Sequence, residues 1–412
     1  MISFLLLIVA VNLTGQQNYD IVLKGGHVID PKNRINGLMD VAVTNGRIAR
    51  VAADSPAAQA RKTVNAKGLF VTPGLIDIHV HVFPRPGQPG VQRDSSVPAD
   101  AFSFRSGVTT VVDAGTTGVK TFPEFRKQVI DRAQTRVLAL LNIVAAGMGT
   151  GQEDDPAQLD AQAAATMAKA NRGVIVGFKS AHYAGPGWES VEKAVTAGKM
   201  ADLPVMIDFG YLNKVRNLNT LLLDKLRPGD IYTHCYSGHR EELLPDGKVN
   251  PAMVAARKRG VIFDVGHGAG SFYWYVATAA LKQGFAPDSI STDLHSGSMN
   301  AGMKDMANTM SKILNLGSPL DQVISMSSWN PARQIKRPDL GHLSVGAEAD
   351  VAVLRVDSGS FGFIDSAGAA NTGSKNIVCE LTLRKGKVVW DLNGRAAENW
   401  QKFRYEKKAW TK

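Results

Sequence analysis

The sequence predicts a (β/α)8 TIM barrel joined to a small β-sandwich domain that both ends of the chain form together. Two observations predict this architecture. In the middle of the chain, apolar runs rich in β-branched residues alternate with helical segments, as parallel strands and their connecting helices do. At both ends, shorter strand-like runs follow one another through turns. We therefore expect a barrel over residues 68–335 and a composite β-domain from residues 18–67 and 336–412.

Eight apolar runs mark the expected barrel strands, which is the number that a (β/α)8 barrel needs. They are Leu75–Val82, Val108–Asp113, Val137–Val144, Val174–Lys179, Pro204–Phe209, Ile231–Cys235, Val261–Gly266 and Ser289–Asp293. Between them, segments such as Pro156–Asn171 and Glu189–Ala201 have the residue pattern of helices.

Turn signals and strand-like runs define the composite β-domain. In its first half, the run Asp40–Thr44 leads into Asn45-Gly46, a dipeptide typical of two-residue hairpin turns. In its second half, Ala349–Leu354 and Ile377–Leu383 are strand-like, and a further turn and strand follow them. We therefore expect the two ends of the chain to build one domain.

Composition excludes several classes of protein. The chain has 412 residues, of which 44% are hydrophobic and 20% charged, and this is too apolar for a disordered protein. It has only two cysteines, Cys235 and Cys379, which excludes a small domain stabilised by disulfides. The two cysteines fall in different predicted layers, and we expect no bridge between them.

The first residues are predicted to direct export. The apolar run Phe4–Val11 has the length of a signal-peptide core and is too short to span a bilayer. We interpret residues 1–17 as a signal peptide and expect a periplasmic or secreted protein. The alternatives are a buried first strand and a misassigned start, and a misassigned start would leave the protein cytoplasmic. No other segment reaches about 18 apolar residues in a row, so we expect no stable membrane insertion.

Much of the positive charge lies near the C-terminus. The net charge is +10, and residues 384–412 have nine Lys or Arg against three Asp or Glu. A basic tail of this kind can bind nucleic acid or an anionic surface. However, no zinc-finger spacing, RNA-binding signature or basic heptad helix accompanies it. We interpret the tail as a solvated strand and helix, and we expect no nucleic-acid partner.

Polar residues collect where the predicted strands end, and barrels of this class carry their active sites there. The first run ends in Asp77-Ile-His79-Val-His81. Histidines at positions i and i+2 of a strand point to the same face, so two imidazoles there can hold one cation. The spacing alone also fits a pair of core histidines, but its place at the end of the first barrel strand favours a metal site.

Lys179 ends the fourth run. Beside a metal ion an ammonium group would be repelled, whereas a neutral, desolvated amine can react with carbon dioxide. The resulting carbamate is an anion that can bridge two metal ions. The alternative is a lysine with a buried stem and an amine that reaches solvent. The residues alone leave both interpretations open.

Further candidates follow the other runs. His234 ends the sixth run, His267 follows the seventh, and Asp293 ends the eighth. Six of the nine histidines lie at or just after a predicted strand end, a concentration that scattered structural histidines would not show. These six are His79, His81, His182, His234, His267 and His295. Taken singly, His182 and His295 also fit the interpretation of a hydrogen-bonded core histidine.

Together these residues resemble the amidohydrolase superfamily of metal-dependent hydrolases, over nearly the whole chain. The segment Val71-Thr-Pro-Gly-Leu-Ile-Asp-Ile-His-Val-His is similar to its first-strand motif, and Gly107-Val-Thr-Thr-Val-Val-Asp-Ala-Gly resembles its second strand. Ser328-Trp-Asn-Pro-Ala and Gly341-His-Leu-Ser-Val-Gly-Ala-Glu-Ala-Asp-Val-Ala-Val-Leu resemble the segments after the barrel. More narrowly, Asp264-Val-Gly-His-Gly and Ser291-Thr-Asp-Leu-His are similar to a dihydroorotase-like branch of amidohydrolases and deacetylases.

The resemblance implies a site with one or two zinc ions, and other divalent metals are possible there. It implies that His79 and His81 bind the buried ion and that an N6-carboxylated Lys179 bridges the two ions. Asp293 would contact the metal and act as the general base. His267 would orient substrate or stabilise the oxyanion, and the weaker candidates for contact with substrate are Asp113, His182, Tyr183 and His295. The resemblance also implies a homo-oligomer.

Strand five departs from the family pattern. The family has one histidine at the end of strand five and one at the end of strand six. His234 supplies the second, but the position of the first is Asp208. Either Asp208 replaces the imidazole as a ligand, or the outer metal is weak or absent, or His267 moves in to ligate. We favour the first interpretation, because carboxylate oxygens bind zinc at distances similar to those of imidazole nitrogens.

The function that follows is metal-dependent hydrolysis of a small-molecule amide or ester. Deacetylation of an N-acyl or O-acyl compound is the first interpretation. Opening of a cyclic amide, as by a hydantoinase or dihydroorotase, and cleavage of a dipeptide are the enzymatic alternatives. A non-catalytic metal-binding barrel is a further alternative. The retained set of candidate ligands argues against it: His79, His81, Lys179, His234 and Asp293.

Overall fold

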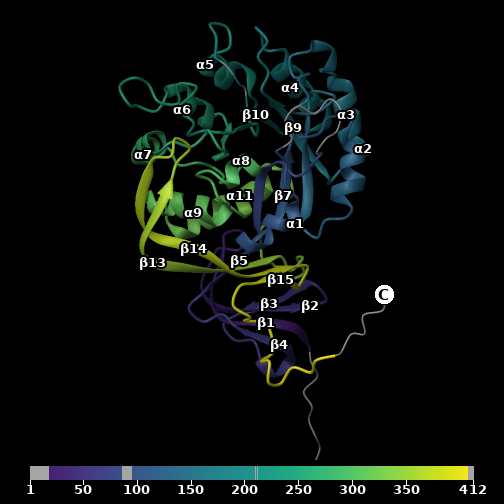
Figure 1. Ribbon diagram of the computed structural model, residues 1–412, viewed down its shortest axis with the longest axis vertical. Coiled ribbons are helices and arrows are strands. Elements are labelled where there is room, and N and C mark those ends of the chain that lie inside the picture. Colours follow the sequence, from purple (N-terminus) through teal and green to yellow (C-terminus); the bar gives the residue numbers. More distant parts are fainter. Residues whose placement is uncertain (1–17, 86–94, 209, 211, 407–412) are drawn as a thin grey trace, which may run out of the picture.

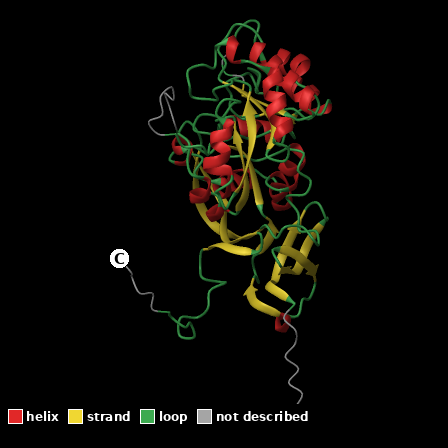
Figure 2. Cartoon of the chain, turned by 90° about the vertical axis from the view of Figure 1, so that its right-hand side faces the viewer, coloured by secondary structure: helices red, strands yellow, loops and turns green. Residues whose placement is uncertain are grey.

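The structure is a computed structural model, and it describes residues 18–85, 95–208, 210 and 212–406. The expected signal peptide lies outside the described residues, as do Phe209 in the fifth run and residues 407–412 of the basic tail. Figure 1 shows two parts, a barrel surrounded by helices and, below it, a sheet from the ends of the chain. Figure 2 shows the same division from the side.

The chain ends form a separate sheet of eight strands, in agreement with the sequence pattern. Its order is β15-β14-β13-β5-β1-β2-β3, and β4 pairs with β1 beside this path. Asn45 and Gly46 turn between β2 and β3 with φ angles of 50° and 74°, the left-handed conformation that this hairpin turn requires. The strands are β1 (Tyr19–Asp30), β2 (Ile35–Thr44), β3 (Arg47–Ala52), β4 (Ala60–Asn65), β5 (Phe70–Pro73), β13 (Val351–Ile364), β14 (Ala370–Arg384) and β15 (Lys387–Asp391).

β5 joins the two halves of this sheet. One edge of β5 pairs parallel with β1, and the other edge pairs antiparallel with β13. These hydrogen bonds place β5 in the sheet of the chain ends, although its residues precede the barrel directly. Apolar side chains from both ends, such as Val71, Val353 and Leu381, are buried in one common core. Each half of the domain therefore depends on the other for its core.

The barrel has seven regular strands in the described residues, and each pairs parallel with the next along the chain. This agrees with the expected alternation of strands and helices. The strands are β6 (Leu75–Val80), β7 (Val108–Ala114), β8 (Arg136–Asn142), β9 (Ile175–Ala181), β10 (Val205–Asp208), β11 (Ile231–Tyr232) and β12 (Ile262–Phe263).

The eighth run closes the barrel but does not form a regular strand, contrary to the prediction. On one side, His267 N donates to Ser291 O at 3.2 Å. On the other side, His81 N donates to Leu294 O at 2.9 Å. The segment between these bonds is irregular because Asp293 has a φ of 50°, outside the β region.

Positive φ angles also shorten the two preceding strands, β11 and β12. The runs predicted over Ile231–Cys235 and Val261–Gly266 give strands of only two residues each. His234 has a φ of 63° and Gly266 a φ of 46°, and both therefore leave the β region before the predicted end of the run. The strands are thus irregular at the end of the barrel where the candidate ligands lie.

Helices surround the barrel, and α4 (Glu189–Ala201) has the predicted bounds. The helix expected over Pro156–Asn171 instead begins with a 3₁₀ turn at Pro156–Gln158 and continues as α3 (Ala161–Ala170). The others are α1 (Ala99–Phe102), α2 (Phe122–Phe125), α5 (Leu218–Thr220), α6 (Pro251–Lys258), α7 (Trp274–Lys282), α8 (Ser296–Met299), α9 (Met306–Asn315), α10 (Leu320–Met326) and α11 (Trp329–Gln334). None of the described helices is long and apolar enough to cross a membrane.

The long hairpin of β13 and β14 connects the sheet of the chain ends to the barrel. Figure 1 shows its outer part rising beside α9. There, Ile377 N of β14 donates to Ser311 Oγ of α9 at 2.9 Å. Cys379 on β14 and Cys235 in the barrel are both buried free thiols.

We predict that Leu381→Ala lowers the free energy of unfolding by about 2–5 kcal/mol, because Leu381 is fully buried in the core that both chain ends share. Urea unfolding followed by circular dichroism measures this change. Leu38→Ala removes the same atoms from a side chain of β2 that is 72% exposed, and it should change stability by less than about 0.5 kcal/mol. Equal effects of the two substitutions would contradict a common core.

Candidate metal centre and active site

The C-terminal ends of the barrel strands bring the predicted metal ligands together. His79 lies on β6 and His81 directly follows it, whereas Lys179 lies on β9, Asp208 ends β10 and His234 follows β11. Asp293 comes from the segment that closes the barrel. Apart from the partly exposed Asp293, all of these side chains are buried.

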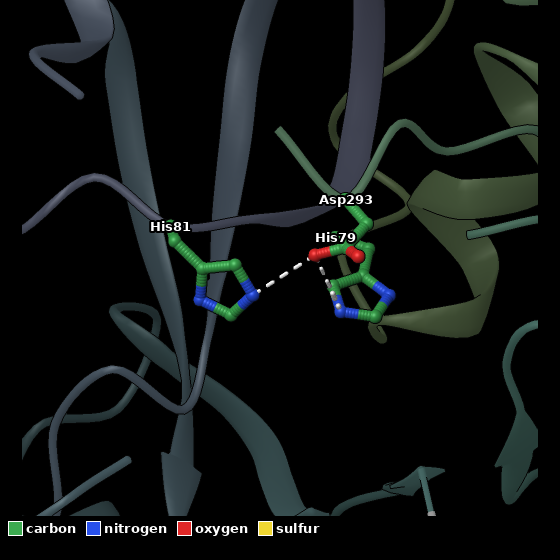
Figure 3. Close-up of side chains that lie close together, drawn as sticks. All are labelled: His79, His81 and Asp293. Carbon is green, nitrogen blue, oxygen red and sulfur yellow. Dashed lines mark ion pairs between the residues drawn. The ribbon is translucent and has the colours of Figure 1, made fainter. Parts of the chain in front are cut away.

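His79, His81 and Asp293 form a tight group (Figure 3). Oδ1 of Asp293 lies 3.0 Å from Nε2 of His81 and 3.5 Å from Nε2 of His79. Each of the three residues offers one ligand atom, and these atoms all lie within 4.8 Å of one another. Two imidazole nitrogens and a carboxylate oxygen are donors that zinc prefers in proteins.

Hydrogen bonds at the opposite ring nitrogens orient both imidazoles. Nδ1 of His79 lies 3.0 Å from Oγ1 of Thr233, whose own proton goes to Oδ2 of Asp264 at 2.8 Å. Thr233 therefore accepts from Nδ1–H, and Nε2 of His79 turns its lone pair toward Asp293. Oγ1 of Thr116 lies 3.0 Å from Nδ1 of His81 and occupies the equivalent position. Such contacts fix the tautomer and the ring orientation of metal-binding histidines.

Lys179 is a buried amine beside these ligands. Its side chain is 1% exposed, and Nζ lies 3.1 Å from Nε2 of His79. The amine therefore does not reach solvent. This differs from the alternative interpretation, in which the amine of this lysine is solvated. Burial lowers the pKa of Lys179, and burial together with Lys179 holds the pKa of His79 well below its ordinary value. A neutral amine is the form that can react with carbon dioxide.

Asp208, His182 and His234 form a second group next to the first. Oδ2 of Asp208 lies 3.4 Å from Nε2 of His234 and 3.5 Å from Nε2 of His182. Nδ1 of His234 donates to the carbonyl of Gly266 at 2.5 Å, so its Nε2 points a lone pair at Asp208. A carboxylate oxygen and an imidazole lone pair that face each other need a cation or a proton between them. The chemistry of this group therefore suits a second metal ion.

Arg240 is a residue of the site that sequence reasoning missed. It is 7% exposed, and its Nη2 donates to Oδ1 of Asp208 at 2.6 Å. Burial opposes the ionisation of Asp208, but His234, His182 and Arg240 together hold its pKa well below its ordinary value. Arg240 thus occupies one carboxylate oxygen and leaves the other for the histidines. No motif marks this arginine, because it lies in an irregular loop that folds back across the end of β10.

His182 and His295 lie on the solvent side of the two groups. The side chain of His182 is 57% exposed. That of His295 is 20% exposed, and its Nε2 lies 4.0 Å from Oδ2 of Asp293. Both rings are therefore accessible to an incoming molecule. Tyr183 is different, because it is buried and its hydroxyl donates to Glu189 Oε2 at 2.8 Å.

His267 is fully buried, and the structure occupies both of its ring nitrogens. Nε2 accepts from Lys312 Nζ at 2.7 Å, Nδ1 lies 2.9 Å from the carbonyl of Gly268, and the ring stacks on Phe272. Burial and the facing Lys312 lower the pKa of His267 to about 3. In this arrangement neither nitrogen is left for a metal ion or an oxyanion.

The backbone around His267 contacts the ligands instead. Gly266 and Gly268 both have positive φ angles, of 46° and 56°. A Cβ atom on Gly266 would lie 2.2 Å from Thr233 Oγ1, and one on Gly268 would lie 2.5 Å from Oδ2 of Asp293. Both positions therefore need glycine, since the chain passes directly over the ligands. Asp113 also has a structural position, because it accepts from Val82 N at 2.9 Å.

Three further residues that hold the site were missed from the sequence. Thr233 and Asp264 follow β11 and β12, so the rule that strand ends carry chemistry could have found them. Lys312 lies on α9, is fully buried, and donates to His267 and to the carbonyls of Gly302 and Ile364. No sequence signal marks it, because a lysine on a helix is normally solvated.

Known proteins are similar to this chain over most of its length. A deacetylase from Agrobacterium fabrum is 32% identical over 79% of this chain and 80% of its own length. A deacetylase from Brucella anthropi is 32% identical over 74% of this chain and 76% of its own. The model of the Amidohydrolase family matches residues 275–389. This chain belongs to the amidohydrolase family.

Solved structures share the fold of this amidohydrolase. A crystal structure of an adenine deaminase has a TM-score of 0.82 at 28% identity and covers 91% of this chain and 100% of its own. A crystal structure of a dihydroorotase has a TM-score of 0.78 at 27% identity and covers 90% and 99%. The predicted barrel class is therefore confirmed. As an amidohydrolase, the protein is a metal-dependent hydrolase.

We predict that Thr233→Val lowers the metal affinity of this amidohydrolase by about 10- to 100-fold, because Nδ1–H of His79 loses its acceptor. Competition with a chromophoric zinc chelator measures the affinity. Thr117→Val is the matched control, since Thr117 is 1% exposed and its Oγ1 has no hydrogen-bond partner among the described residues. A similar loss of affinity in both variants would contradict the orienting role of Thr233.

Proposed function

We propose that the protein is a deacetylase that hydrolyses small N-acyl or O-acyl compounds. The observation that carries the proposal is the group of two buried imidazoles, His79 and His81, whose Nε2 atoms face the carboxylate of Asp293 at the mouth of the barrel. The names of its relatives support the choice of reaction. Besides the two deacetylases above, a deacetylase from Enterococcus faecalis is 29% identical over 90% of this chain and 99% of its own length.

In this proposal two groups of residues hold two metal ions. His79, His81 and Asp293 would hold one ion, His234 and Asp208 would hold the other, and Lys179, once carboxylated, would supply an anionic ligand to the site. Zinc suits these nitrogen and oxygen donors. When bound, the metal polarises the carbonyl of the substrate and lowers the pKa of the attacking water.

Asp293 moves the proton in the proposed reaction. Burial opposes its ionisation, but His79 and His81 hold its pKa below its ordinary value, so it is a carboxylate at neutral pH. Its Oδ1 faces the two imidazoles, whereas its Oδ2 faces Gly268 and His295. Oδ2 is therefore the atom that takes the proton of the attacking water and passes it to the leaving group.

Asp208 and Arg240 together take the place of the strand-five histidine. A carboxylate in place of an imidazole adds one negative charge, and the guanidinium at 2.6 Å adds one positive charge. The pair therefore has the net charge of a neutral imidazole. Oδ2 of Asp208 could then serve as a ligand without making the site more negative than a histidine would.

Opening of a cyclic amide is the second candidate. The structure described as a dihydroorotase favours it, because it aligns with 90% of this chain at 27% identity. The chemistry of attack is the same in the two candidates, and they differ only in whether the carbonyl belongs to a ring.

We predict turnover of acyl compounds in a panel of N-acetyl-D-amino acids, acetylated hydroxy acids, hydantoins and dipeptides. Asp293→Asn should lower kcat on the best substrate by at least about 100-fold at saturating metal, because the proton acceptor is lost. Turnover restricted to hydantoins would replace the proposal by cyclic-amide opening, and turnover restricted to dipeptides by a dipeptidase. Full metal loading without any turnover would leave a binding protein.

We predict that Lys179→Ala removes the second metal ion, because no carbamate ligand can form. The metal content of purified protein, reloaded with zinc in the presence or absence of bicarbonate, measures this. Bicarbonate should raise the metal content and activity of the natural protein but not of Lys179→Ala. Lys169→Ala, at an exposed position of α3, should respond to bicarbonate like the natural protein. Full activity of Lys179→Ala would refute the role of this residue.

A further inference from the structure

A cavity lies between the barrel and the sheet of the chain ends, apart from the candidate metal centre. Its volume is about 490 Å³, within the range of about 300–1,000 Å³ that small-molecule sites occupy. Arg136, at the first residue of β8, lines it, whereas Asn142, at the last residue of β8, pairs with Lys179 of the active site. The length of this strand, roughly 20 Å at ~3.3 Å per residue, therefore separates the cavity from the active site.

Positive charge dominates the lining of this cavity. Six basic side chains line it, and they come from both ends of the chain and from the barrel. Asp339 and Glu348 are the acidic lining residues. Asp350 is not part of the lining, but it forms ion pairs with Arg136 and Arg384. Three positive charges remain in excess. The basic residues are Lys32, Arg47, Arg136, Arg337, Arg384 and Lys385.

Lys32 and Arg47 carry two of the three excess charges. Nζ of Lys32 donates to the carbonyl of Pro338 at 3.3 Å, and Nη1 of Arg47 donates to the carbonyl of Gly346 at 2.7 Å. Within the described part of the chain, neither side chain forms an ion pair. By contrast, Arg337 makes two hydrogen bonds to the carboxylate of Asp339.

Two buried donors in the lining also lack a partner. Arg384 and His342 are each 8% exposed, and Arg384 Nε and His342 Nε2 have no hydrogen-bond partner among the described residues. Nδ1 of His342 accepts from Ser344 N at 3.2 Å, so the neutral ring has its proton on Nε2. The carbonyl of Pro338 acts to raise the pKa of His342. However, this carbonyl already accepts a hydrogen bond from Lys32, and its geometry does not allow a hydrogen bond from Nε2.

We propose that this cavity binds a compact anion with two or more negative charges, of the diphosphate or polycarboxylate class. Water alone would satisfy the buried donors but would leave the three excess charges repelling one another. An anion accepts hydrogen bonds from the buried donors and also neutralises the excess charges, since guanidinium groups donate paired hydrogen bonds to phosphate and carboxylate oxygens. Because the lining comes from three separate parts of the chain, the bound anion also ties the sheet of the chain ends to the barrel.

The test is a calorimetric titration of the full-length, metal-loaded protein with pyrophosphate and, in a second arm, citrate. We expect binding of at least one of the two and a rise in the midpoint of thermal unfolding. Binding of pyrophosphate alone identifies a phosphate site, and binding of citrate alone identifies a carboxylate site. Metal content is measured before and after each titration, so that chelation is not counted as binding.

Variants locate the binding. The double substitution Lys32→Ala with Arg47→Ala should weaken binding at least about tenfold, because two of the three excess charges are lost. Arg50→Ala with Lys62→Ala is the matched control, since it removes the same charge from exposed positions of β3 and β4 outside the cavity. No binding at about 10 mM of either anion, or equal affinity in the two double variants, would overturn the proposal.

Discussion

The candidate site depends on one constraint, which is that imidazole lone pairs must face a common point in a dry interior. An imidazole can rotate and exchange its proton between two nitrogens, so burial alone does not aim it. Thr233 aims His79, and the carbonyl of Gly266 aims His234. Thr233 itself is held by Asp264, which also accepts from Ser289 and Ser291. A network of hydroxyl groups beneath the ligands therefore sets the direction of the donor atoms above it.

This constraint explains why the barrel is least regular where it is most polar. His182, His234 and Asp293 all have positive φ angles, which side chains other than glycine rarely adopt. Each angle turns the chain out of its ladder at the point where the side chain meets the others. Regular pairing is lost there, and apolar packing of the seven regular strands supplies the stability that holds these conformations.

Sequence reasoning predicted the parts that follow from local patterns. Alternating apolar runs and helices gave the barrel, and histidines at strand ends gave most of the polar groups that meet at its mouth. It failed where a residue acts through a distant partner. Arg240 lies in an irregular loop and reaches Asp208, and Lys312 is a helical lysine that is buried only because Gly302 and Ile364 supply acceptors. Such contacts follow from the tertiary fold and leave no periodic signal.

The position of β5 between β1 and β13 has a consequence for the way the protein is made. Thr72 of β5 and Ala352 of β13 are hydrogen-bonded neighbours that lie 280 positions apart in the chain. At a synthesis rate of ~5–20 residues per second, the first strands wait tens of seconds for their partner. During this time their apolar side chains and one open edge have no native cover. These strands are thus completed late in synthesis, and their open edge needs protection from aggregation in the nascent chain.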